Sequence, residues 1–205
     1  MESKSIKIAW TIFAVLAAHL LSCSSDDAAG RRLDSKEDQL HVLADAPAFE
    51  GVTQNNVAMS SGELDGSIWV ASFMFTSCGG SCPVMNSNLA KLQDEFADIE
   101  NLTFVSFTVD PERDSISVLK SYAAKYGARE SRWQFVRMPK EAVAKLSAEG
   151  FLLGNVDSPA MHSSRFALVD SHGKIRGFYD GLDEEAMHKL RKALRSLADG
   201  EAAQS

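Results

Sequence analysis

The stretch Phe75-Thr-Ser-Cys-Gly-Gly-Ser-Cys-Pro-Val-Met85 holds two cysteines, Cys78 and Cys82, between an apolar run and a helix-like segment. If the backbone begins its first helical turn there, side chains four residues apart share one face, with Cβ atoms ~5–6 Å apart. The two sulfurs then lie within reach of one metal ion or of each other. A helix N-terminus also favours thiolate over thiol. The alternative is a structural pair, either two buried cysteines or a disulfide, which the small residues between them disfavour.

The chain of 205 residues is long enough for one domain and a tail. Its hydrophobic content of 45% and charged content of 24% are ordinary for a globular domain. The formal net charge of −7, with no basic cluster to offset it, argues against nucleic acid as a partner.

The first residues have the features of an export signal. Lys4 and Lys7 precede the apolar segment Ile8–Leu21, which is short for a transmembrane helix of ~20 apolar residues. We therefore predict a signal peptide over residues 1–22. The run Leu-Leu-Ser-Cys23 resembles a bacterial lipobox, which implies that Cys23 is lipidated and anchors the mature chain to a membrane. The alternative is simple secretion, with Cys23 as an incidental thiol.

Lipidation of Cys23 leaves Cys78 and Cys82 alone with each other among the three cysteines. In an oxidising, exported setting two such thiols tend to oxidise unless they are kept reduced or bound to metal. The cysteine count therefore restricts the chemistry to redox or metal binding.

The rest of the chain predicts one α/β domain over residues 47–199, preceded by a flexible tether (23–46) and followed by a disordered tail (200–205). Strands are expected over Phe49–Met59, Ser67–Phe75, Leu102–Val109, Trp133–Val136, Arg165–Val169 and Lys174–Tyr179. Helices are expected from about Pro83 to Asp98, over residues 116–126 with Asp114 or Ser115 as the cap, over Lys140–Ala148, and from Asp183 or Glu184 onward. This order indicates a mixed central sheet flanked by helices, with the cysteines at the first strand-to-helix junction of its core.

Of the five histidines, His162 is the best candidate to complete a site with the two cysteines. It follows a glycine- and proline-containing loop and directly precedes a strand, which predicts a position at the end of the sheet. His172 and His188 are expected to be solvated. Two thiolates and one imidazole suit Cu(I) and accommodate Cu(II) or zinc. On position alone a structural histidine stays the more common reading.

Three motifs occur in order: Phe-Thr-Ser-Cys-x3-Cys-Pro, Phe-Thr-Val-Asp-Pro-Glu-Arg-Asp114, and Met161-His-Ser-Ser-Arg-Phe-Ala-Leu-Val-Asp-x-x-Gly. Together they resemble the SCO/SenC family over residues 49–197. The resemblance implies a thioredoxin-like fold with an N-terminal hairpin extension, and a copper chaperone for the CuA centre of cytochrome c oxidase. It further implies that Cys78, Cys82 and His162 bind one copper ion per chain.

The same resemblance implies a client, either subunit II of cytochrome c oxidase or another copper- or thiol-containing protein. It also suggests that Asp110 or Asp114 assists in redox chemistry or in partner contact. Helix capping and turn formation are equally good explanations for these two aspartates. The expected location is the bacterial cell envelope, facing the periplasm, with the protein acting as a metallochaperone rather than an enzyme.

The sequence departs from the family in the loop between the cysteines. Family members usually carry Pro-Asp there, whereas this chain has Gly79-Gly80-Ser81. The loop therefore lacks the rigidity of proline and a nearby carboxylate. A second hypothesis stays open, in which Cys78 and Cys82 are catalytic in thiol–disulfide exchange or act in a copper or redox sensor, although thioredoxin-like oxidoreductases usually space their cysteines by two residues.

Overall fold

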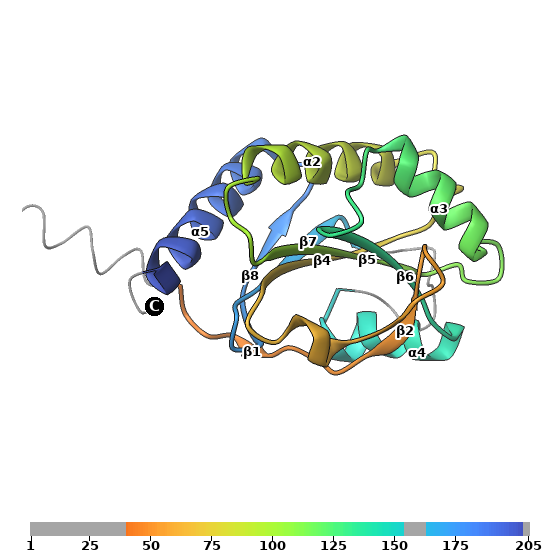
Figure 1. The fold of residues 1–205 in the computed structure, drawn as a ribbon, viewed down its shortest axis with the longest axis horizontal. Coiled ribbons are helices and arrows are strands. Elements are labelled where there is room, and N and C mark those ends of the chain that lie inside the picture. Colours follow the sequence, from red (N-terminus) through yellow and green to blue (C-terminus); the bar gives the residue numbers. More distant parts are fainter. Residues whose placement is uncertain (1–39, 154–162, 203–205) are drawn as a thin grey trace, which may run out of the picture. The chain divides into compact units, whose positions relative to one another are not determined.

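The structure is a computed structural model that describes residues 40–153 and 163–202. Within these residues, a mixed eight-stranded sheet has the strand order β1-β8-β7-β4-β5-β6-β2-β3 (Figure 1). Strands β4, β5 and β6 are parallel, whereas β7 and β8 run antiparallel to their neighbours. These five strands are β4 (Ile68–Met74), β5 (Leu102–Thr108), β6 (Trp133–Arg137), β7 (Arg165–Val169) and β8 (Lys174–Asp180). Their positions confirm the expected strands to within one or two residues.

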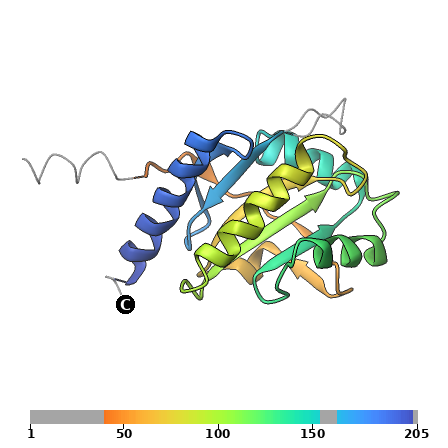
Figure 2. The same cartoon turned by 90° about the horizontal axis from the view of Figure 1, so that it is seen from above.

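Helices α2 (Ser81–Glu95), α3 (Ile116–Lys125) and α5 (Glu184–Ala202) cover one face of the sheet, and α4 (Lys140–Lys145) lies against the other (Figure 1). Seen from above, α2 lies between α5 and α3 (Figure 2). Helices on both faces of a mixed sheet confirm the predicted α/β class. No helix in the part of the chain that the structure describes is long and apolar enough to cross a membrane.

Two helical boundaries differ from the sequence prediction. Helix α2 ends at Glu95 rather than near Asp98. The helix expected over Lys140–Ala148 is shorter, because α4 is followed by a π-helical turn, η2 (Leu146–Gly150). Periodicity of apolar residues continues through such a turn, so the pattern does not reveal the change in hydrogen bonding.

The core lies on both faces of the sheet. Every residue of β4 is buried, as its continuous apolar run predicts. Successive side chains of a strand point to opposite faces. Ile68 and Val70 therefore join the core beneath α2, α3 and α5, whereas Trp69 and Phe73 join the core on the side of α4.

The N-terminal part forms β2 (Glu50–Thr53) and β3 (Ala58–Ser60), an antiparallel hairpin whose first strand pairs with β6. The prediction of one strand over Phe49–Met59 is wrong, because a turn interrupts it at Asn56, which has φ 60°. Asparagine tolerates this left-handed conformation better than most residues. The hairpin itself is the expected N-terminal extension of the thioredoxin-like fold.

Two smaller elements complete the described chain. The turn η1 (Ser61–Leu64) follows β3 and carries a capping box between Ser60 and Glu63. The strand β1 (Ala44–Asp45) pairs with β8, within the range that the sequence assigns to the tether. Two residues are too short a run for any periodic pattern, so this pairing is visible only in the tertiary structure.

The segments that carry the three sequence motifs adjoin the same end of the central strands. Met74 pairs with Thr108, so the parallel strands β4 and β5 end at this edge. Strand β7 runs in the opposite direction, with Ala167 opposite Ala71, so it begins there. The segments that follow β4 and β5 and the segment that precedes β7 therefore share one edge.

Candidate metal centre

The loop that follows β4 carries both cysteines to this edge. The Cys78 backbone N–H donates to the Phe75 carbonyl at 3.2 Å, which closes a turn. Helix α2 then begins at Ser81, so Cys82 is its second residue. Proline follows as the third residue, where the helix needs no N–H donor. The predicted strand-to-helix junction is confirmed, with Cys82 inside the first turn and Cys78 in the loop before it. The expectation that the two cysteines share one helical face is wrong, because α2 begins three residues after Cys78.

The two sulfurs have different surroundings. Cys82 is 0% exposed and belongs to the core beneath α2, whereas Cys78 is partly exposed and packs against the rim of that core. The two residues are not joined in a disulfide, and their side chains are hydrogen-bonded to each other. The pair is therefore close enough to bind one ion or to form a disulfide, and its chemistry is accessible from the side of Cys78.

Burial dominates the protonation of the inner thiol. It raises the pKa of Cys82 to about 12, and the hydrogen bond with Cys78 acts in the same direction. A backbone hydrogen bond at Phe75 opposes this shift. The dipole of α2 does not outweigh burial, so the expectation that the helix N-terminus favours thiolate does not hold for Cys82. At neutral pH a metal ion must therefore displace a proton from this sulfur.

Polar and aromatic side chains lie behind Cys82. Asn86 follows it by one helical turn, is buried, and donates from Nδ2 to the Tyr122 hydroxyl of α3 at 2.9 Å. Burial raises the pKa of Tyr122, with smaller contributions from Tyr126 and from the charge of Cys82. The inner wall of the site is thus a packed, neutral surface contributed by α2 and α3.

The third expected ligand, His162, lies outside the described residues. The residue next to it in the chain, Ser163, donates its N–H to the Leu153 carbonyl at 3.1 Å. Among residues 40–153 and 163–202, no group of three His, Cys, Asp or Glu side chains could hold a metal ion. His172 and His188 are exposed, as predicted.

Helix α2 is tied to the segment that precedes β7. Asn88 donates from Nδ2 to the Gly181 carbonyl at 2.9 Å, and the Gly181 N–H donates to the Ser164 carbonyl at 2.7 Å. Ser164 immediately precedes β7. The helix that carries Cys82 and the start of β7 are therefore held together at the edge of the sheet where the motifs meet.

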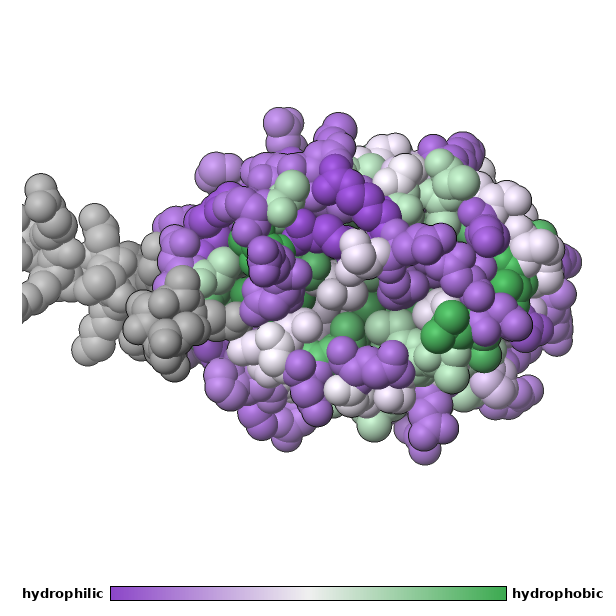
Figure 3. All heavy atoms as spheres, viewed as in Figure 1, coloured by the Kyte–Doolittle hydropathy of each residue, from purple (hydrophilic) through white to green (hydrophobic). Residues whose placement is uncertain are grey.

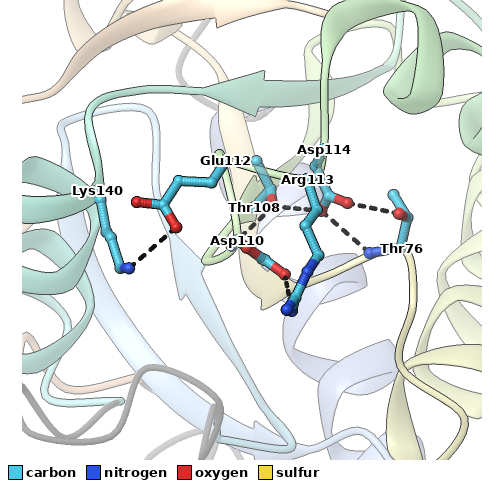
Figure 4. A network of polar contacts seen from close by, with 7 residues as sticks. All are labelled: Thr76, Thr108, Asp110, Glu112, Arg113, Asp114 and Lys140. Carbon is cyan, nitrogen blue, oxygen red and sulfur yellow. Dashed lines mark hydrogen bonds and ion pairs between the residues drawn. The ribbon is translucent and has the colours of Figure 1, made fainter.

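The two aspartates of the second motif differ in burial (Figure 4). Asp110 is partly exposed and accepts a hydrogen bond from Arg113 Nη1 at 3.1 Å. Asp114 is 0% exposed and accepts three hydrogen bonds, from the backbone N–H and the hydroxyl of Thr76 and from the hydroxyl of Thr108. Ser115, not Asp114, caps α3. Direct contact with a partner is thus open to Asp110 but closed to Asp114.

Thr76 and Thr108 are site residues that the sequence reasoning missed. Thr76 stood in the first motif, but nothing local marked its bond to an acid 38 residues away. Thr76 also lines an open cleft of about 430 Å³ on α3 with Ser117, Val118, Ser121, Tyr122 and Lys125. On the face that Figure 3 shows, polar side chains predominate and hydrophobic ones reach the surface in small groups.

Fold and site together define a thioredoxin-like domain with two neighbouring free cysteines at a strand-to-helix junction. The SCO1/SenC family model matches residues 38–198. The chain therefore belongs to the SCO1/SenC family.

Two curated relatives support this assignment. The SCO1 protein homolog of Bacillus subtilis is 30% identical over 168 residues, covering 79% of this chain and 86% of the relative. A putative copper-binding protein of Stutzerimonas stutzeri is 31% identical over 142 residues, covering 64% of this chain and 67% of the relative.

Solved structures agree with the fold. A SCO1/SenC family lipoprotein from Bacillus anthracis is 31% identical, with a TM-score of 0.67 over 76% of this chain and 95% of that one. BsSco, described as a Sco family cytochrome c oxidase assembly protein with a disulfide switch, is 26% identical, with a TM-score of 0.64 over 75% of this chain and 95% of that one. These similarities confirm the predicted family and its thioredoxin-like fold.

Proposed function

We propose that this protein is a membrane-anchored copper chaperone of the bacterial cell envelope. It binds one copper ion through Cys78, Cys82 and His162 and delivers it to the CuA site of cytochrome c oxidase. The observation that carries the proposal is the adjacent pair of thiols at the start of α2, one buried and one partly exposed. Membership of the SCO1/SenC family, with a relative named as copper-binding, supports copper as the ion.

The chemistry of the pair favours a soft ion. Thiolate sulfur prefers Cu(I) to hard ions such as magnesium or calcium. Binding replaces the thiol proton of each cysteine with a bond to the metal, so protons are released as copper enters. With three protein ligands, copper keeps an open coordination position at which a client's cysteine or histidine can attack.

The unequal exposure of the two sulfurs suggests an order for transfer. Cys78 is accessible from solvent, so its bond to copper is the one that a client ligand replaces first. Cys82 lies in the core and releases the ion last. A cytochrome c oxidase subunit fits as the client because a relative of known structure is an assembly protein of this oxidase.

The membrane anchor rests on Cys23 and on the lipoprotein relative. Cleavage after residue 22 and acylation of Cys23 place the domain at the end of the tether, facing the periplasm. Mass spectrometry of the mature protein tests this part. We expect a diacylated N-terminal Cys23, and recovery of Cys23→Ser outside the membrane fraction.

Thiol–disulfide exchange is the second candidate function, favoured by the contact between the two thiols. The Cys78 thiolate would attack a client disulfide and release one client thiolate, which takes up a proton. Cys82 would then displace the second client sulfur. The client leaves as a dithiol, and Cys78 and Cys82 are left oxidised to a disulfide, with two electrons transferred.

Copper titration distinguishes the two functions. We expect the reduced wild-type chain to bind one equivalent of Cu(I) in competition with a chromophoric chelator. His162→Ala should weaken this binding at least about tenfold while its dithiol still reduces a model disulfide. The exposed histidine variant His188→Ala is the matched control and should bind as the wild type does.

Unchanged copper affinity in His162→Ala would overturn the three-ligand site. A reduced wild-type chain that binds no copper but reduces disulfides rapidly would overturn the chaperone function in favour of thiol–disulfide exchange.

A further inference from the structure

The loop that holds Cys78 has few constraints of its own. Gly79 and Gly80 have no heavy atom within 4 Å of the place where a Cβ would stand. Glycine also allows the backbone a wide range of conformations. The segment between Thr76 and the start of α2 is therefore open on the side of these two glycines, and it contains no proline.

The loop is fixed at Thr76 instead. Its backbone N–H donates to Asp114 Oδ2 at 3.0 Å, and its hydroxyl donates to Asp114 Oδ1. Both hydrogen bonds reach one carboxylate, which determines the position and the orientation of the residue. Thr76 stands two residues before Cys78. A displacement of Thr76 is therefore carried along the backbone to the Cys78 sulfur.

Asp114 is itself held rigidly. Its Oδ2 accepts from the Thr108 hydroxyl at the end of β5, and its backbone N–H donates to the Asp110 carbonyl at 2.9 Å. The Asp110 N–H in turn donates to the Thr108 Oγ1 at 3.1 Å. Ser115 then begins the cap of α3. Three donors satisfy the oxygens of this buried carboxylate, and these hydrogen bonds lower the free-energy cost of burying it.

Figure 4 shows Thr76 and Thr108 pointing toward the Asp114 carboxylate from two different segments. These hydrogen bonds join Thr76 and Thr108 to Asp114, which has no exposed surface with which to contact a client. Asp114 therefore acts on the site through its hydrogen bonds with Thr76, which precedes Cys78 in the same loop.

We infer that Asp114 and Thr76 are positioning residues that set the distance between the Cys78 and Cys82 sulfurs. The inference deepens the proposed function and rests on it for copper, but the same positioning governs formation of the Cys78–Cys82 disulfide. Cys82 is held by α2 and the core. The loop that carries Cys78 is anchored at Thr76 by its contact with Asp114.

The test compares full-length variants by Cu(I) affinity and by the thiol–disulfide equilibrium of the copper-free chain in a glutathione buffer. Thr76→Val removes the hydroxyl donor. We expect it to weaken Cu(I) binding about tenfold and to shift the equilibrium constant with glutathione about tenfold. Tenfold is the lower end of what residues outside the ligand set contribute to metal affinity. Thr76→Ser keeps the donor and should restore both values. Thr108→Val, which removes a donor at β5, should act in the same direction and serves if Thr76→Val folds poorly.

Asp114→Asn separates hydrogen bonding from charge. Its carbonyl oxygen can replace Oδ2, and its amide can donate to the Thr76 hydroxyl, so it should remain within about threefold of the wild type. A shift in Asp114→Asn as large as in Thr76→Val would overturn positioning in favour of the carboxylate charge.

Ser106→Ala is the stability control. It removes a buried hydroxyl that bonds Ser72 Oγ at 2.8 Å and Trp133 Nε1 at 2.9 Å, away from the loop. It should lower the melting temperature without altering either site readout. If Thr76→Val only loses stability, as this control does, the inference is overturned. If the wild type binds no copper but Thr76→Val shifts the glutathione equilibrium, the copper function fails and the positioning role stands.

Discussion

Cys78 and Cys82 are four residues apart, yet one belongs to a loop and the other to the core. Cys82 is 0% exposed and belongs to the core between the sheet and the helices α2, α3 and α5. Cys78 is partly exposed and precedes two glycines with open space around them. The comparison teaches that one sulfur of the pair is built into the core, whereas the other stays partly exposed. In the function that we propose, this exposed sulfur is the one that a client reaches.

Replacing each cysteine with serine should produce the largest contrast. Cys82→Ser puts a hydroxyl into the core and should cost about 1–3 kcal/mol of unfolding free energy unless a partner is found. Cys78→Ser should change stability by no more than about 0.5 kcal/mol, because its site is partly exposed. Both should lose tight copper binding. Urea unfolding of the copper-free variants measures the two losses of unfolding free energy. Equal losses in Cys78→Ser and Cys82→Ser would contradict the difference in burial between the two sites.

Alkaline pH should destabilise the protein through the inner thiol. The pKa of Cys82 is about 12 in the folded chain, above the ordinary cysteine value of about 8.5 expected after unfolding. The folded state therefore keeps a proton that the unfolded state loses. This stability is complete below about pH 8.5 and is lost as the pH rises toward 12, by at most about 1.4 kcal/mol per pH unit.

Urea unfolding at several pH values between about 8 and 10 measures this decline. Cys82→Ala should flatten it, whereas Cys78→Ala should leave it in place. Tyr122, whose pKa burial also raises, contributes only at higher pH. A decline of the same slope in Cys82→Ala would show that other groups cause it.

The smallest expected effect concerns the glycines of the loop. Gly79 has no atom within 4 Å of an added Cβ and lies outside the left-handed region, so alanine fits there. Gly79→Ala should stabilise the protein by about 0.4–1 kcal/mol, because it restricts the unfolded chain. Gly173→Ala is the control of opposite sign, since Gly173 has φ 67° in the hairpin turn. Thermal unfolding of the two variants checks both signs, and a destabilised Gly79→Ala would contradict the open loop.

Much of the fold was predictable from the sequence. Strands β4, β5, β7 and β8 and the helix after Cys82 come from local patterns in the sequence, and each was expected near its observed position. The junction that carries Cys78 and Cys82 followed from the order of these elements.

The Thr76–Asp114 contact could not be predicted in the same way. It depends on the parallel register that sets Met74 opposite Thr108, and register is a property of strand pairing rather than of either strand. The pKa of Cys82 was missed for a similar reason. The helix dipole is a local feature, whereas the burial that outweighs it comes from the packing of helices on the sheet.

The two edge strands of the sheet matter if the protein is held at a membrane, as we propose. Strand β1 has two residues and β3 has three, so neither outer strand offers a long row of unpaired backbone groups. Short outer strands give little template for strand pairing between molecules. If the proposed anchor concentrates copies of the domain at a membrane, this sheet gives them little opportunity to join edge to edge.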